Sequence, residues 1–299
     1  MRAMALLLAG ILLFPAAYCQ FYYYNERYYD RPLILEGGIS SGYMNCLTDL
    51  GGNAGQAGSF LKDVHVASGK PFVALNLAAR YQSAIGLRIA LTRGAVQAAD
   101  SLIRGSPPAD HRYWRNLHFR SLIREVTVLA EWYPLTGLAR SDRKLRCMPY
   151  LLAGIGLFSF DPVAVLDGRQ IRLQPLKTEG QGLAEYPHRP SYALTQWNFP
   201  TGIGINYEAG AIISLRLETV YRFLQTDYLD DVSTRYIPSD RFYRVHDPQT
   251  AQVAARLADQ RRGPARNIPG AIRGNPENKD GYFTLAVSLG IALNRKAIR

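Results

Sequence analysis

The feature that most constrains this fold is a two-residue alternation of apolar and polar or small side chains. It is clearest near the end of the chain, where every second residue from Phe283 to Leu293 is large and apolar and the residues between them are small or polar. Successive side chains of a strand point to opposite faces. The segment therefore predicts a strand with one continuous apolar face.

The same alternation recurs along the chain and predicts eight strands, at 33–42, 73–80, 85–92, 125–132, 150–160, 199–207, 213–223 and 282–293. Most segments have near the 9 to 11 residues that a tilted strand needs to cross a bilayer. An even number of such strands, apolar outside and polar inside, is typical of outer-membrane barrels. We therefore expect an all-β protein, an eight-stranded antiparallel transmembrane β-barrel.

The polar face of these strands carries ionisable side chains of both signs. An eight-stranded barrel is only wide enough inside for side chains, and buried charges need partners. We expect ion pairs that plug the barrel; an ion pathway is the alternative reading. The expected interior charge network is Glu36, Arg80, Arg88, Glu125, Glu131, Arg216, Glu218 and Arg222, with Asn76 beside it.

The connections between the expected strands alternate in length. Short links fall at 82–84, 134–145 and 209–210, whereas long loops fall at 44–69, 98–114, 161–195 and 225–280. Outer-membrane barrels alternate short periplasmic turns with long outer loops. The alternative is a soluble lipocalin-like barrel with an apolar interior, which the expected export of the chain disfavours.

Export is predicted by the first residues. Arg2 is followed by an apolar run to Ala17 that is too short for a spanning helix, so residues 1–19 are expected to be a signal peptide cleaved after Cys19. A lipoprotein acylated at Cys19 is the alternative. An aromatic tail, 20–32, precedes the first strand, and residues 295–299 form a basic C-terminal tail. The tail's tyrosines are partner-contact candidates unless they lie along the membrane interface: Tyr22, Tyr23, Tyr24, Tyr28 and Tyr29.

The chain carries a formal net charge of +11. Its basic residues are scattered, with no basic helix or RNA-binding signature, so lipids and protein partners are expected and nucleic acid is not. Two cysteines, Cys46 and Cys147, remain after the expected cleavage. They are predicted to lie at opposite ends of the barrel, too far apart for a disulfide.

No catalytic, cofactor or metal constellation is found. None of the five histidines has a nucleophile or zinc partner at a recognisable spacing. Calcium at Asp227, Asp230 and Asp231 is an alternative, but the glycine-bearing spacing of a calcium loop is missing. Apolar residues between Ala251 and Ala258 predict a short amphipathic helix that packs on its own loop.

Several motifs resemble one known family. They are Asp161-Pro162, the stretch Leu176 to Gly182, and the run Glu218 to Ser233, with Pro149-Tyr150 ahead of a glycine-rich strand. Over residues 33 to 293 the chain resembles the PorG family, the outer-membrane barrel of the Bacteroidetes type IX (Por) secretion system. The first loop and the insertion at 249–278 match nothing in it.

The resemblance implies a non-enzymatic subunit of a protein secretion machine, with no cofactor. Its implied partners are the periplasmic ring proteins, a lipoprotein and its partner, beneath the outer membrane. A barrel enzyme of lipid modification and an adhesin stay open as alternatives. The family motifs add these partner-contact candidates: Glu179, Gln181, Asp227, Tyr228, Asp230 and Asp231.

Overall fold

The computed structural model describes residues 32–51, 68–102, 111–138, 146–210, 212–262 and 268–295. The expected signal peptide and all five tail tyrosines lie outside these ranges, as do residues 296–299.

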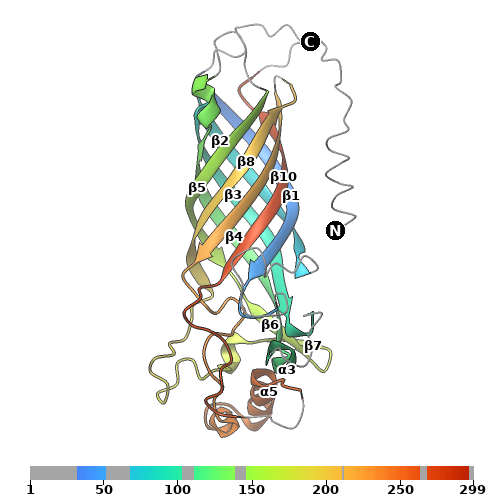
Figure 1. Ribbon diagram of the computed structural model, residues 1–299, viewed down its shortest axis with the longest axis vertical. Coiled ribbons are helices and arrows are strands. Elements are labelled where there is room, and N and C mark those ends of the chain that lie inside the picture. Colours follow the sequence, from blue (N-terminus) through green and yellow to red (C-terminus); the bar gives the residue numbers. More distant parts are fainter. Residues whose placement is uncertain are drawn as a thin grey trace. The chain divides into compact units, whose positions relative to one another are not determined.

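Eight strands close into an antiparallel barrel (Figure 1). Each strand pairs with the next along the barrel chain, and β10 pairs with β1 to close the ring. The predicted fold class is confirmed. The barrel strands are β1 (Leu33–Leu47), β2 (Lys70–Tyr81), β3 (Ile85–Ala99), β4 (His118–Trp132), β5 (Cys147–Ser159), β8 (Thr195–Glu208), β9 (Ile213–Leu224) and β10 (Gly281–Ala292).

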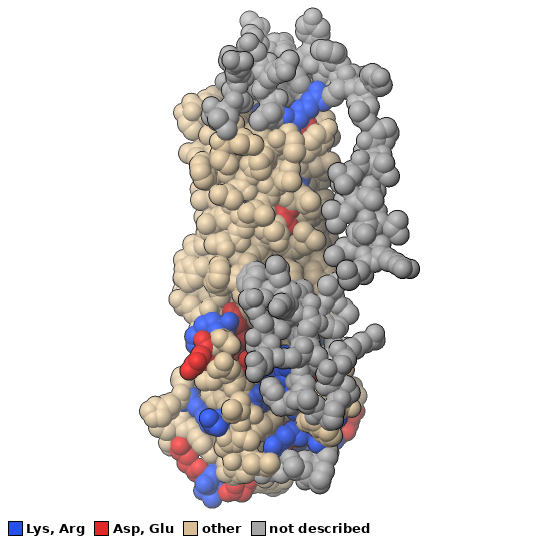
Figure 2. All heavy atoms as spheres, viewed as in Figure 1, with Lys and Arg blue, Asp and Glu red and all other residues tan. Residues whose placement is uncertain are grey.

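The barrel is apolar outside and polar inside. Outward residues such as Leu75 and Leu77 are 59% and 63% exposed, whereas the inward Arg88 and Glu218 are 3% and 4% exposed. Figure 2 shows a barrel wall almost free of charged side chains, with charges gathered at the end that carries the long connections. An apolar belt around a polar interior suits a lipid surround and reverses the pattern of a soluble barrel. The lipocalin-like alternative is therefore wrong.

Several strands extend further than the alternation predicted. β1 runs past the expected end at residue 42, so Met44 and Cys46 lie within the strand and not in a loop. β3 likewise runs on to Ala99. Inward side chains at this end, such as Met44 and Val96, are fully buried because they share an apolar cluster with residues of the long connections. The strands therefore stay paired beyond the apolar belt, where the two-residue pattern fades.

All four long connections lie at one end of the barrel and fold there into a cap, at the bottom of Figure 1. A two-stranded hairpin inside the third connection was not predicted, and it joins the sheet where β6 pairs with Arg120 and Ser121 of β4. The cap contains β6 (Pro162–Leu166), β7 (Arg169–Arg172), α3 (His111–Arg115), α4 (Phe242–Val245), α5 (Pro248–Ala258) and short 3-10 helices at Asp100–Leu102, Gln174–Leu176 and Ser239–Arg241.

At the opposite end, the described residues include the β2–β3 turn and the start of the β4–β5 link. β2 and β3 are joined by a tight turn in which the Ala84 amide donates to the Tyr81 carbonyl at 3.0 Å. The link between β4 and β5 begins with a 3-10 helix, Pro134–Leu138. None of the described helices is long and apolar enough to cross a membrane.

An aromatic ladder connects the barrel to the cap. Phe158 stacks on Phe160 with ring centroids 5.4 Å apart, Phe160 on Tyr192 at 6.0 Å, and Tyr192 on Tyr228 at 4.9 Å. Buried α5 residues, including Leu257, belong to the same apolar core. The cap therefore has a core of its own that is continuous with the outer end of the barrel interior.

Candidate functional site

The barrel interior is filled by ion pairs. Arg88 lies between two carboxylates: its Nε is 3.0 Å from an oxygen of Glu131 and its Nη2 is 2.5 Å from one of Glu218. Arg216 bridges Glu36 at 2.5 Å and Glu131 at 3.4 Å. Each of these side chains is less than a tenth exposed.

Two further arginines extend the plug towards both ends. Arg222 contacts Glu125 at 3.2 Å, and Arg80 contacts Glu208 at 2.7 Å. The structure thus places all eight expected interior charges inside the barrel and buried. Glu208 was missed, although it follows Asn206 at the two-residue spacing of inward positions on β8.

Hydroxyl and amide groups complete the plug. Tyr282 donates to Glu125 at 3.0 Å, Asn198 donates to the same carboxylate at 2.7 Å, and Tyr133 donates to Glu131 at 2.8 Å. An ion path would need a continuous wet lumen. A lumen occupied by Arg, Glu and Tyr side chains is a packed core with no room for one.

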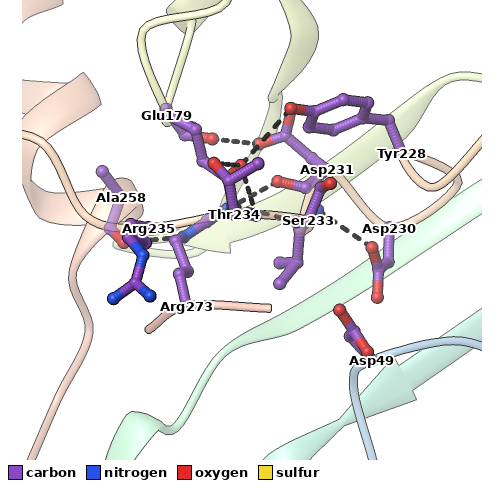
Figure 3. A network of polar contacts seen from close by, with 12 residues as sticks. Asp49, Glu179, Tyr228, Asp230, Asp231, Ser233, Thr234, Arg235, Ala258 and Arg273 are labelled. Atoms are coloured by element: carbon purple, nitrogen blue, oxygen red, sulfur yellow. Dashed lines mark hydrogen bonds and ion pairs between the residues drawn. The ribbon is translucent and has the colours of Figure 1, made fainter. Parts of the chain in front are cut away.

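In the cap, a second polar network is centred on Arg273 and Glu179 (Figure 3). Arg273 Nη1 donates to Glu179 Oε1 at 2.8 Å and to the Asp231 carbonyl at 2.6 Å, while its Nε donates to the Ala258 carbonyl at 3.2 Å. Arg273 is 2% exposed and Glu179 is 0% exposed. The pair is therefore held entirely inside the cap.

Glu179 organises the segment after β9. Its carboxylate accepts from the backbone amides of Ser233 and Thr234 at 3.0 and 2.9 Å, and from the Thr234 hydroxyl at 2.6 Å. Arg189 Nη1 donates to the Glu179 carbonyl at 2.7 Å. One buried carboxylate thus fixes the turn at 233–234 against the third connection.

Asp231 is held in a left-handed backbone conformation, with φ of +64°. Its carboxylate accepts from the Thr178 hydroxyl and, at 2.7 Å, from the Tyr192 hydroxyl. Asp231 and Thr178 belong to two of the motifs that carry the resemblance, the run Glu218 to Ser233 and the stretch Leu176 to Gly182. These motifs are far apart in the sequence, and the fold brings them together in one buried contact.

Arg115 joins the remaining connections to this network. It forms two parallel bonds to Asp100, both at 2.8 Å, and donates to the carbonyls of Arg273 and Asp49, both at 2.6 Å. Since Arg273 contacts Glu179, this chain of contacts links all four long connections. Neither Arg115 nor Arg273 was predicted, because isolated arginines in loops carry no spacing signal.

Four carboxyl groups of the cap, those of Asp49, Asp227, Asp230 and Asp280, lie close enough to affect one another. Burial raises the pKa of Asp230 and of Asp227 to about 8, and each is raised further by neighbouring aspartates. Burial also raises the pKa of Asp49 to about 6 and that of Asp280 well above its usual range. Burial thus favours the protonated form of all four carboxyl groups.

The motif residues expected to contact partners lie mostly inside the cap. Glu179, Asp230 and Asp231 are 0% exposed, Gln181 is 2% and Asp227 is 4%, whereas Tyr228 is half-buried. Side chains so buried cannot reach a partner surface. For the five buried residues the contact prediction is therefore wrong, because they shape the cap from within. For Tyr228 it stays a prediction.

The carboxylates of Asp230 and Asp231, which were considered for calcium, bind different partners. Asp230 accepts from the Leu50 and Val232 amides, while Asp231 turns to Thr178 and Tyr192. Across the described ranges, no three His, Cys, Asp or Glu side chains form a group that could hold a metal ion. Cys46 and Cys147 are both free, as predicted, Cys46 being buried and Cys147 exposed.

Fold and interior together define the class: this chain is an eight-stranded outer-membrane β-barrel with a plugged lumen and a folded cap. Among solved structures it is similar to Neisserial surface protein A, with a TM-score of 0.38 and 9% identity over 88% of this chain and 98% of that one. It is also similar to Ail, the attachment invasion locus protein of Yersinia pestis, with a TM-score of 0.33 and 10% identity over 86% and 97%. No family model and no curated protein matches it.

Proposed function

We propose that this chain is a non-enzymatic outer-membrane subunit of a protein secretion machine of the type IX class. The observation that carries the proposal is the convergence of the two family motifs. Glu179 from the first accepts amide hydrogens from Ser233, the last residue of the second, and from Thr234, which follows it, and Asp231 accepts from Thr178. The residues behind the resemblance thus serve one structural purpose, the building of the cap.

The filled lumen assigns the barrel an anchoring role within such a machine. Arg88, Glu131 and Glu218 occupy the barrel interior with their charges satisfied by one another. Unpairing them to open a path for a polypeptide would leave buried charges uncompensated, at a cost of about 3–5 kcal/mol for each broken pair. The barrel therefore holds other components at the membrane and does not pass substrate.

The expected periplasmic ring then meets the short-turn end of the barrel. The cap lies at the opposite end and faces outward, since the long loops of such barrels are extracellular. We assign the contact with ring proteins to the surface near the turn at Gln82 and Ser83. The cap then faces the cell exterior.

Site-specific photo-crosslinking in intact cells tests this assignment. A photoreactive residue at Gln82, in the exposed turn, should crosslink to a periplasmic lipoprotein of the ring. The matched control is the same probe at Tyr243, which is 53% exposed in the cap and should give no ring adduct. Capture of extracellular partners at Tyr243 with none at Gln82 would overturn the proposal in favour of an adhesin.

A further inference from the structure

Two arginines lie side by side on the outside of the barrel, and a third lies nearer the cap on the same face. Arg93 on β3 is directly opposite Arg124 on β4, and Arg120 lies four residues before Arg124 on the same face of β4, with Leu122 between them. All three side chains are exposed. Directly opposed residues have Cβ atoms about 4.5–5.5 Å apart, whereas residues i and i+4 of a strand lie about 13 Å apart. We call Arg93, Arg120 and Arg124 the arginine patch.

The patch has no acidic partner. Its directly opposed neighbours on adjacent strands are Val73 for Arg93, Ser159 for Arg124, and Gln97 and Val163 for Arg120. Across the described ranges, no ion pair or side-chain hydrogen bond involves any of the three arginines. Asp161, which directly precedes β6, already pairs with Arg172 at 2.9 Å.

An unneutralised cross-strand arginine pair is unfavourable by itself. Like charges directly opposite each other destabilise a sheet. The interior of the same barrel matches its arginines with glutamates, so the fold has the means to neutralise a charge where one is needed. A ligand anion between the two guanidinium groups would remove the repulsion.

The height of the patch on the barrel indicates where that anion comes from. β4 descends from the cap, and Arg124 precedes the periplasmic-end Trp132 by eight residues, which for a tilted strand is about 20 Å. One step closer to the periplasm, the next pair of lipid-facing residues is apolar. Leu91 lies opposite Val126, and the two side chains are 51% and 49% exposed. The patch therefore lies near the outer edge of an apolar band about 25 Å tall, at the level of the lipid head groups.

We propose that the arginine patch binds the phosphate groups of an anionic lipid in the outer leaflet of the outer membrane. Guanidinium groups bind phosphate oxygens through paired, charge-assisted hydrogen bonds. Arg93 and Arg124 hold one phosphate between them, and Arg120, about 13 Å further along β4 towards the cap, binds a second phosphate of the same lipid. The acyl chains of the same lipid lie against Leu91 and Val126 on the wall below.

Native mass spectrometry of the full mature protein in non-ionic detergent tests the proposal, with diphosphoryl lipid A as the probe. The Arg93→Gln/Arg124→Gln variant should bind the probe about 30-fold more weakly than the wild type, a factor of about five for each charge. The control variant Arg169→Gln/Arg256→Gln removes two exposed cap charges and should bind as the wild type does. Arg93→Lys/Arg124→Lys, which keeps the charge, should lose much less affinity.

Lipid A stripped of its phosphates should bind the wild type as weakly as diphosphoryl lipid A binds the Gln variant. Millimolar inorganic phosphate should not displace the bound lipid, because the acyl chains contribute to binding. Equal binding of diphosphoryl lipid A by the wild type and the Gln variant would overturn the proposal, as would displacement by inorganic phosphate. Each variant is first checked for a closed barrel by the mobility of unboiled samples on a gel.

Discussion

At the residue scale, buried arginine and carboxylate groups hold the structure together, both in the barrel and in the cap. Alternation alone places the barrel charges, because inward positions recur at every second residue within each strand, from the strand of Glu36 to that of Glu218. The cap network could not be predicted from this alternation. Arg115 contacts the Arg273 carbonyl across 158 residues of sequence, and Arg273 contacts Glu179 across 94, and no local spacing encodes such contacts.

Arg273→Gln tests the cap network. The substitution leaves Glu179 buried without its counter-charge and should destabilise the cap by about 3–5 kcal/mol. The barrel should stay closed, while the third and fourth long connections become sensitive to limited proteolysis. The matched control is Arg235→Gln, since the Arg235 side chain is exposed and donates only to the Gly270 carbonyl at 2.8 Å. Equal resistance of the two variants would count against the network.

The raised pKa values of the cap aspartates predict a pH dependence. Unfolded aspartates ionise near pH 4, whereas burial raises the pKa of Asp230 and Asp227 to about 8 in the folded cap. The folded state therefore binds more protons between these values, so the cap should be most stable at low pH and lose stability as pH rises to about 8.

Limited proteolysis of the cap should accordingly be faster at pH 9 than at pH 5, after correction for protease activity. Asp230→Asn should flatten this dependence, because it removes one of the groups that titrates. Asp167→Asn is the control: Asp167 is exposed, and its hydrogen bond to Arg256 lowers its pKa. Faster cleavage of the cap at pH 5 than at pH 9 would contradict the predicted loss of cap stability as pH rises.

At the element scale, the strands and α5 could be predicted, whereas the β6–β7 hairpin was missed. The signal for the hairpin is present in the sequence. Asp167-Gly168 joins the two short strands with both residues at positive φ, +51° and +77°, and Asp-Gly between extended segments is a strong hairpin signal. It was missed because the surrounding residues do not show two-residue alternation over a full strand length.

The tight turn between β2 and β3 offers a stability prediction. Gln82 and Ser83 both have positive φ, +48° and +56°, a conformation that costs residues other than glycine about 1–2 kcal/mol. Ser83→Gly should therefore raise the free energy of unfolding by about 1 kcal/mol, measured by urea unfolding in lipid vesicles. Ser159→Gly, at a strand position without positive φ, should not stabilise the barrel. A lower unfolding midpoint for Ser83→Gly would contradict the turn geometry.

At the scale of the whole molecule, alternating loop lengths predicted which connections gather at one end. They did not predict that these connections fold into a cap with its own core. That core depends on Phe160, Tyr192 and Tyr228, whose stacking comes from three-dimensional proximity and follows no sequence period.

Cysteine labelling tests the orientation of the barrel. Cys46 is 7% exposed beneath the cap, and Cys147 begins β5 at the short-turn end. A membrane-impermeant maleimide should therefore leave both unmodified in intact cells and should reach Cys147 only after the outer membrane is permeabilised. A cysteine introduced at the exposed cap position, Tyr243→Cys, should be labelled in intact cells. Labelling of Cys147 in intact cells would place the cap in the periplasm.

The central claim is that the chain is a closed, plugged barrel in the outer membrane. Because every strand is hydrogen-bonded on both sides and Arg–Glu pairs fill the interior, detergent should not open the barrel without heat. The most direct test is gel mobility of the purified protein in dodecyl sulfate, compared between unboiled and boiled samples. We predict that the unboiled protein migrates as a faster, compact band and the boiled protein as an unfolded chain. Identical migration of the two samples, with the protein recovered from outer membranes, would contradict the closed barrel.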